Sequence, residues 1–144
     1  MTYDVAAPPR RASRLPAIAG PVAVALAAGA ATAFVAAVDP NEAGHYPTCP
    51  SLWLTGWYCP GCGSLRAIHD LAHLNVVGAI DMNPFAIIAI GWLVWRWGWW
   101  LADAMGYRRV VKPAPAWALY LLAGTVVAYW VLRNVGPLAP YLAP

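Results

Sequence analysis

Three long apolar stretches separated by polar segments limit what this chain can fold into. They run over about 17–38, 83–102 and 114–135, and about 20 apolar residues in a helix cross the hydrocarbon core of a bilayer. The chain is 61% hydrophobic and 10% charged, whereas soluble domains average about 25% charged residues. The first stretch is too long for the core of a usual signal peptide, so we interpret it as a retained anchor. The sequence therefore predicts an all-α membrane protein with three transmembrane helices.

The basic residues predict how these helices cross the membrane. Segments rich in Lys and Arg stay in the cytoplasm, and the loop 39–82 holds one basic residue, Arg66, against four acidic ones. The basic residues near the other ends of the spans are Arg10, Arg11, Arg14, Arg108, Arg109 and Lys112. We expect a bacterial plasma-membrane protein with a cytoplasmic N-terminus and with the loop 39–82 and the C-terminus outside. The formal net charge of +3 then reflects topology, and we expect no nucleic-acid partner.

The remaining segments are predicted to be a tail, a loop and a short helix. Residues 1–15 are polar and are expected to form a disordered cytoplasmic tail, while 16–144 form a single membrane domain. In the outer loop, 39–58 is rich in Pro and Gly, which predicts irregular structure. Residues 64–80 have apolar positions at helical spacing, which predicts a short amphipathic helix capped by Ser64.

Two helix faces are predicted to contact other helices. Small residues let helices approach closely in lipid, and Ala25, Gly29 and Ala33 recur every four residues in the first stretch. Tryptophans gather in the inner half of the second stretch, and three of them share one face: Trp92, Trp95 and Trp99. The arginines within the stretches, Arg96 and Arg133, are expected to extend to the headgroups at the nearer membrane surface.

Three cysteines, Cys49, Cys59 and Cys62, are the disulfide candidates of the outer loop. Exterior compartments favour disulfides, and three cysteines allow one internal bridge with one thiol left over. A bridge from Cys49 to Cys59 or to Cys62 would close a loop of about ten residues or slightly more and stabilise it by roughly 2–3 kcal/mol in the chain-entropy model. The main interpretation is a structural staple, with the pairing left open.

Two other roles for the cysteines stay open. Cys59 and Cys62 form a Cys-x-x-Cys pair before a predicted helix, whose start, together with Arg66, would lower a thiol pKa for thiol–disulfide exchange. Alternatively, Cys49, Cys59 and Cys62 offer a Cys₃His set for zinc together with His69 or His73. The sequence holds no phosphate loop, nucleophile elbow or Cys-x-x-Cys-His haem motif, so we expect no catalytic residue, no cofactor and no enzyme activity.

The cysteine motif extends into a longer pattern that resembles a known family. The pattern consists of Cys49-Pro50, Gly56, Cys59-Pro60-Gly61-Cys62-Gly63, Arg66-Ala67, Gly78-Ala79 and Asn83-Pro84. Over roughly 45–100 the chain resembles a widespread family of small bacterial membrane proteins of unknown function, with Leu65 where that family is expected to have Thr. It is also similar to actinobacterial accessory subunits that accompany the cytochrome bcc–aa3 respiratory supercomplex.

These observations lead to two hypotheses of different classes. The resemblance implies a non-catalytic accessory subunit that packs against a larger membrane complex, most specifically a cytochrome oxidase, with lipid covering the rest of its surface. A three-span chain has little private core, which favours such a role. The alternative is a membrane-bound thiol–disulfide or metal-handling protein on the outer face.

Overall fold

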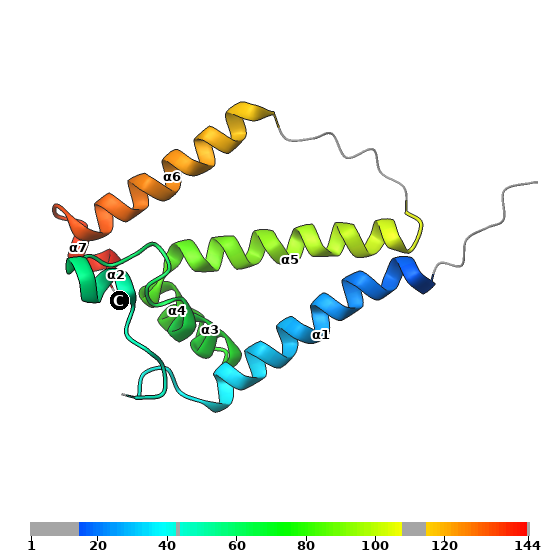
Figure 1. Ribbon diagram of the computed structural model, residues 1–144, viewed down its shortest axis with the longest axis horizontal. Helices are drawn as coiled ribbons and strands as arrows, with labels where there is room; N and C mark the ends of the chain where they lie inside the picture. The colour runs from blue at the N-terminus through cyan, green and yellow to red at the C-terminus, as the bar shows by residue number, and fades with distance from the viewer. Residues whose placement is uncertain (1–14, 43, 108–114, 144) are drawn as a thin grey trace, which may run out of the picture.

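The computed structural model describes residues 15–42, 44–107 and 115–143, and that part of the chain is helical with connecting loops (Figure 1). The helices are α1 (Leu15–Ala37), α2 (Pro50–Thr55), α3 (Ser64–Ala72), α4 (Val76–Met82), α5 (Pro84–Ala104), α6 (Ala116–Asn134) and α7 (Ala139–Leu142). Three of them, α1, α5 and α6, are long and apolar enough to cross a membrane. The predicted all-α fold with three spans is confirmed, and each span begins and ends within two residues of its expected limits.

The three long helices alternate in direction. The C-terminal end of α1, the N-terminal end of α5 and the C-terminal end of α6 lie at one end of the molecule, together with the four short helices (Figure 1). The cysteine loop and the C-terminal segment are therefore on the same side, as three passes require. The side of the membrane that they face stays a prediction, because the basic residues on which it rests, Arg10, Arg11, Arg14, Arg108, Arg109 and Lys112, lie outside the described residues. The predicted disordered tail, residues 1–15, also lies outside the described residues, except for Leu15, which begins α1.

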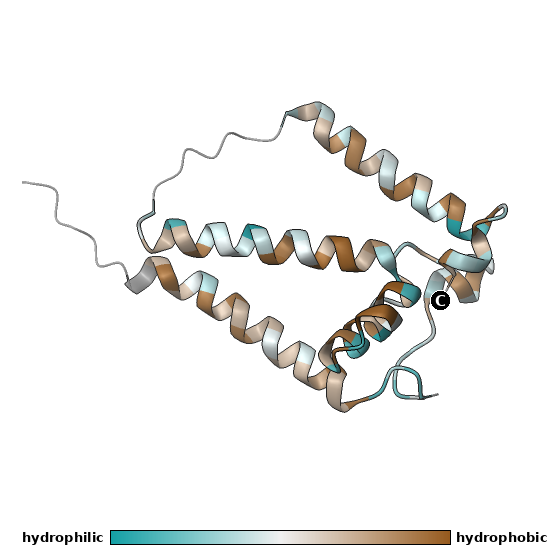
Figure 2. Cartoon of the chain, turned by 180° about the vertical axis from the view of Figure 1, so that it is seen from behind, coloured by the Kyte–Doolittle hydropathy of each residue, from teal (hydrophilic) through white to brown (hydrophobic). Residues whose placement is uncertain are grey.

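Most of the buried side chains gather at this loop end and not between the spans. Buried residues there include Cys62, Ala67, Ala79, Asn83, Ala86 and Arg133. In contrast, only 11% of the most apolar window of α1, and 6% of that of α5 and of α6, is buried inside the chain. Apolar residues are spread along the lengths of α1, α5 and α6 (Figure 2). The short helices thus form the packed part of the molecule, and the long helices extend from it.

At the end of the molecule away from the cysteine loop, α1 and α5 contact each other directly. The indole N–H of Trp97 donates to the carbonyl oxygen of Pro21 over 2.9 Å, and the Pro21 side chain is fully buried. A Cβ built on Gly20 would lie 3.0 Å from the Trp100 ring, so glycine permits this close approach. Near the loop end, α3 packs on α1, where His69 Nδ1 lies 2.9 Å from the Val35 carbonyl oxygen.

The outer loop is more helical than predicted, and the single helix predicted over 64–80 is divided in two. The segment predicted as loop contains α2, which begins directly after Cys49 with Pro50 in its first turn. The helix predicted over 64–80 is wrong as a single element: Leu74 adopts a left-handed conformation with φ 62°, and the chain starts again as α4. Asn75 begins α4 by accepting a hydrogen bond from the Gly78 N–H over 3.0 Å, which satisfies a free donor of the first turn.

The predicted contact faces are largely exposed in the part of the chain that the structure describes. Of the small-residue face, Ala25 is half-buried, whereas Gly29 and Ala33 are exposed. A Cβ built on Gly29 meets nothing within 4 Å. On α5, Trp92 and Trp95 are exposed and Trp99 is half-buried, with Trp95 and Trp99 packed edge to face at 6.3 Å between centroids. The tryptophans that reach α1 are instead Trp97 and Trp100, on another face of α5.

Candidate functional site: a three-cysteine cluster

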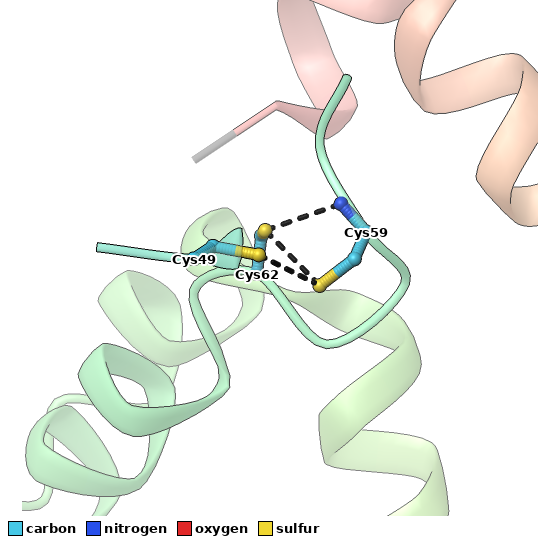
Figure 3. Close-up of side chains that lie close together, drawn as sticks. All are labelled: Cys49, Cys59 and Cys62. Atoms are coloured by element: carbon cyan, nitrogen blue, oxygen red, sulfur yellow. Dashed lines mark hydrogen bonds between the residues drawn. The ribbon is translucent and has the colours of Figure 1, made fainter. Parts of the chain in front are cut away.

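The three cysteine sulfurs converge on one point at the loop end (Figure 3). Cys59 Sγ lies 3.1 Å from Cys62 Sγ and 3.5 Å from Cys49 Sγ, and all three sulfurs lie within 4.8 Å of one another. Cys62 is buried, and the other two are half-buried. All three are free thiols, and their spacing leaves each disulfide pairing geometrically close. Which pairing forms, if any, stays a prediction.

Local backbone geometry brings Cys49 and Cys62 to this point. Gly56 has φ 73° and closes α2 by donating its N–H to the Leu52 carbonyl, so the chain turns back toward Cys49. Gly63 has φ 81° and occupies the cap position of α3. Both angles lie in the left-handed region that glycine adopts without steric cost. Ser64, predicted as the cap, is instead the first residue of α3, and its hydroxyl accepts a hydrogen bond from Asn83.

Arg133 of α6 donates hydrogen bonds to the backbone of the cysteine motif. Its Nη1 donates to the carbonyl oxygens of Cys59 and Pro60 over 3.2 and 3.3 Å, and its Nη2 donates to the Met82 carbonyl over 3.3 Å. The guanidinium also lies 5.3 Å from the centroid of the Tyr129 ring. Arg133 is fully buried, so the prediction that it extends to the headgroups is wrong. Carbonyls of the distant loop accept from both of its terminal nitrogens, while its buried Nε has no hydrogen-bond partner among the described residues.

Asn83 is the second buried tether of the motif. Its Nδ2 donates to the carbonyl oxygens of Pro60 and Cys62, each over 3.0 Å, while its Oδ1 accepts from the Ala86 N–H at the start of α5. The Tyr129 hydroxyl donates to the same Oδ1 over 2.9 Å. One side chain thus caps a span and fixes the loop. The sequence pattern Asn-Pro marked the helix start but gave no sign of the contact with the cysteines.

Asn134 joins the end of α6 to the residue before the motif. Its Oδ1 accepts from the Tyr58 N–H over 2.7 Å, and its Nδ2 donates to the Tyr58 carbonyl over 2.9 Å. Nearby, Trp57 and Trp130 pack edge to face with centroids 5.9 Å apart. These two hydrogen bonds between a side chain and the backbone fix the N–H and carbonyl of Tyr58, the residue directly before Cys59.

The surroundings change the acidity of the thiols in opposite directions. The Leu52 N–H at the start of α2, followed by the thiol of Cys62, lowers the pKa of Cys49 to about 7. Removal from water, followed by the thiol of Cys59, raises the pKa of Cys62 to about 12. The prediction that the helix start after the motif lowers the thiol pKa of the Cys59–Cys62 pair is therefore wrong for Cys62, because burial dominates there. The thiol that a helix start acidifies is Cys49.

His69 does not join the sulfurs. Its Nδ1 faces the Val35 carbonyl, and its Nε2 lies 3.8 Å from Asp39 Oδ1. The group of metal-ligating side chains found among the described residues contains the three cysteines alone. The predicted Cys₃His set is thus wrong in its fourth member. The α3 helix turns His69 toward the end of α1, and His73, the other candidate, places its Nδ1 2.9 Å from the His69 carbonyl oxygen.

A cavity of about 590 Å³ opens beside the cluster. All three cysteines line it, and the other side is formed by the loop that follows α1. The charged residues among its lining are Glu42 and Arg66. The half-buried sulfurs are therefore reached through an open space large enough for a small ligand.

The fold and this site define a class: a three-span helical membrane protein with a cysteine cluster on a loop held by its last span. Residues 49–97 match a family described as a protein of unknown function (DUF2752). The matched segment includes the three cysteines, Asn83 and most of α5, but neither α1 nor α6. No curated protein and no solved structure matches the chain.

Proposed function

We propose that the chain is a non-catalytic accessory subunit of a larger membrane complex, most specifically of a cytochrome oxidase supercomplex. The observation that carries the proposal is how little of each span this chain covers: 11% of the α1 window and 6% of those of α5 and α6. The oxidase itself follows from the resemblance of the sequence to accessory subunits of that assembly.

The exposed faces favour protein neighbours in addition to lipid. In a bilayer, helices associate through close packing and not through hydrophobicity, because lipid tails are equally apolar. Gly29 and Ala33 give α1 a narrow exposed face, and Trp92 and Trp95 give α5 a broad one. These shapes suit packing against other helices.

Purification in a mild detergent tests this function. We expect the tagged chain to bring down haem-containing proteins, detected by their absorbance and by mass spectrometry. Ala33→Ile should reduce this recovery because it fills the small-residue face, while Ala31→Ile, an exposed alanine on the opposite side of α1, should not. Recovery of the unmodified chain only as a free monomer would contradict the proposal.

A second function, membrane-bound thiol–disulfide exchange or metal handling, is favoured by the convergence of the three sulfurs. In exchange, one thiolate of the cluster attacks a partner's disulfide, forms a mixed disulfide and releases a partner thiolate. A second thiolate of the cluster then displaces the remaining partner thiolate. The chain ends with one disulfide, and the partner has gained two electrons and two protons as two thiols.

Thiol trapping in graded redox buffers separates exchange from a structural staple. An exchanging pair should titrate at a mild potential. A structural staple should stay oxidised until the buffer potential falls to about −300 mV or lower. Three thiols that stay reduced at every potential tested would count against both.

A further inference from the structure

We propose that Cys49, Cys59 and Cys62 together bind one thiophilic d¹⁰ cation, Zn²⁺ or Cu⁺, through three thiolates with an open fourth position. This inference rests on the metal-handling branch of the second function above. It commits to a ligand set that excludes His69. It stands on three features of the described residues: the sulfur geometry, the buried charge of Arg133 and the cavity.

The sulfur spacing is close to what a cation requires. Three sulfurs at about 2.3 Å from a tetrahedral zinc ion lie about 3.8 Å from one another. The observed separations are 3.1 and 3.5 Å, and all fall below 4.8 Å, so shifts of less than about 1 Å produce the site. A disulfide uses two sulfurs and leaves the third without a role. A cation uses all three, and soft thiolate ligands select zinc and cuprous ions.

The loop backbone already supplies a donor to the cluster. The Cys59 N–H donates to Cys62 Sγ over 3.2 Å. Such N–H donors stabilise the negative charge that a thiolate carries when it binds a metal. Arg133 and Asn83 hold the carbonyl oxygens of Cys59 and Cys62, so the backbone of these two cysteines is restrained before an ion binds.

Arg133 provides the independent sign of an anionic centre. It is fully buried, and its Nε has no hydrogen-bond partner. Among the described residues its guanidinium is bound by carbonyls and an aromatic face, and the ion pairs found there do not include it. A buried cation without a counter-charge is costly. Three thiolates around Zn²⁺ carry a net charge of −1, which Arg133 would balance across the Cys59 carbonyl. Around Cu⁺ they carry a net charge of −2, of which Arg133 would offset half.

The open fourth position follows from what surrounds the sulfurs. Structural zinc sites are closed by four protein ligands, whereas sites that act on a ligand keep one position open. Among the described residues, the cluster contains three ligands, and the cavity lies beside it. Binding releases three thiol protons to solvent, and the fourth position is left for water or an incoming donor from the cavity.

Metal loading of the full chain in detergent, reduced with a phosphine under nitrogen, tests this site. We expect one equivalent of Zn²⁺ or Cu⁺ per chain by elemental analysis, with each ion offered separately and then in competition to decide between them. Co²⁺ should give a sulfur-to-metal charge-transfer band. Without any substitution, intact-mass alkylation should fall from three modified thiols to none when metal is added.

Substitutions assign the ligands. Cys49→Ser, Cys59→Ser and Cys62→Ser should each weaken binding at least about 100-fold, while His69→Ala and His45→Ala should bind as the unmodified chain does. Arg133→Met should weaken binding by about 10-fold to 100-fold, and Arg133→Lys, which keeps the charge, by less. Circular dichroism of each variant shows whether the helices persist.

Two results would overturn the inference: three thiols that stay fully reactive in excess metal, or a loss in His69→Ala equal to that in the cysteine variants. The outcome is separable from that of the exchange function. A chain isolated with one disulfide, two mass units lighter, that takes up no metal after reduction would leave exchange standing and remove the metal site.

Discussion

Replacing Arg133 with Met should loosen the cysteine loop, because Met fills a similar volume but donates no hydrogen bond. Three carbonyls, of Cys59, Pro60 and Met82, lose their charged donor. A hydrogen bond to a charged group contributes about 1.5–3 kcal/mol. These carbonyls are only partly buried, and those of Cys59 and Pro60 keep a second donor, the Cys62 N–H and Asn83 Nδ2 respectively, so we take about 1 kcal/mol for each lost bond. Removing the guanidinium also removes its own burial cost, including that of the unpartnered Nε, which offsets about 1 kcal/mol. The net loss is about 2 kcal/mol.

The rate at which Cys62 is alkylated in the reduced, metal-free chain measures this loss. Cys62 is buried, so a maleimide reaches it only after the loop opens, and the rate follows the equilibrium for opening. A loss of about 2 kcal/mol raises that rate about 30-fold, since 1.4 kcal/mol is tenfold. The rate in denatured protein normalises the intrinsic reactivity.

Arg96→Met is the matched control for this experiment. Arg96 is exposed on α5, and surface substitutions usually stay within about 0.5 kcal/mol, so the alkylation rate should change by about twofold or less. If Arg133→Met left the rate of Cys62 unchanged while the helical signal was intact, the tether assigned to Arg133 would be refuted.

Three further substitutions separate the supports of the fold. Asn83→Ala should lower the unfolding free energy by about 3 kcal/mol in a denaturant titration, because a helix cap and two carbonyl partners are lost. The control, Asn75→Ala, removes an exposed cap and should cost about 1 kcal/mol. Equal losses would contradict the role of Asn83 in the loop. Gly63→Ala should lower the unfolding free energy by about 1–2 kcal/mol, because the φ of 81° at this position is left-handed. Unchanged stability would show that the turn relaxes to accept alanine. Trp97→Phe should broaden the distribution of spin-label distances between α1 and α5, because it removes the hydrogen bond to α1. Trp95→Phe, at an exposed position, should leave the distribution unchanged. Identical distributions for the two variants would show that this hydrogen bond does not hold α5 to α1.

The helical spans could be predicted from the sequence, but the support of the site could not. Long apolar stretches define membrane helices by their length and composition, and each was placed within two residues. Arg133 was misplaced because an arginine near the end of a span looks the same whether water or a buried loop accepts its hydrogen bonds. Its partners are 73 and 74 residues away, and no local pattern encodes them.

Local rules also failed where a residue departs from its usual conformation. The apolar spacing continues from α3 into α4, so periodicity predicts one helix. The break lies at Leu74 with φ 62°, and leucine gives no signal of a left-handed turn. The next residue, Asn75, was the available sign, because asparagine is a preferred helix cap.

The architecture links the two proposed functions through α6. This helix joins the loop end through Arg133, Asn134 and Tyr129. Arg133 binds the Cys59 carbonyl directly, while Asn134 and Tyr129 act through the neighbouring Tyr58 and through Asn83. A membrane partner that shifts α6 therefore shifts the cysteine backbone as well. If such a partner changes the affinity of the cluster for a cation, then the cation must change the affinity for the partner by the same factor. Recovery of partner proteins with metal-loaded and metal-free chain should then differ by that factor, and Arg133→Met should abolish the difference while leaving partner recovery itself in place.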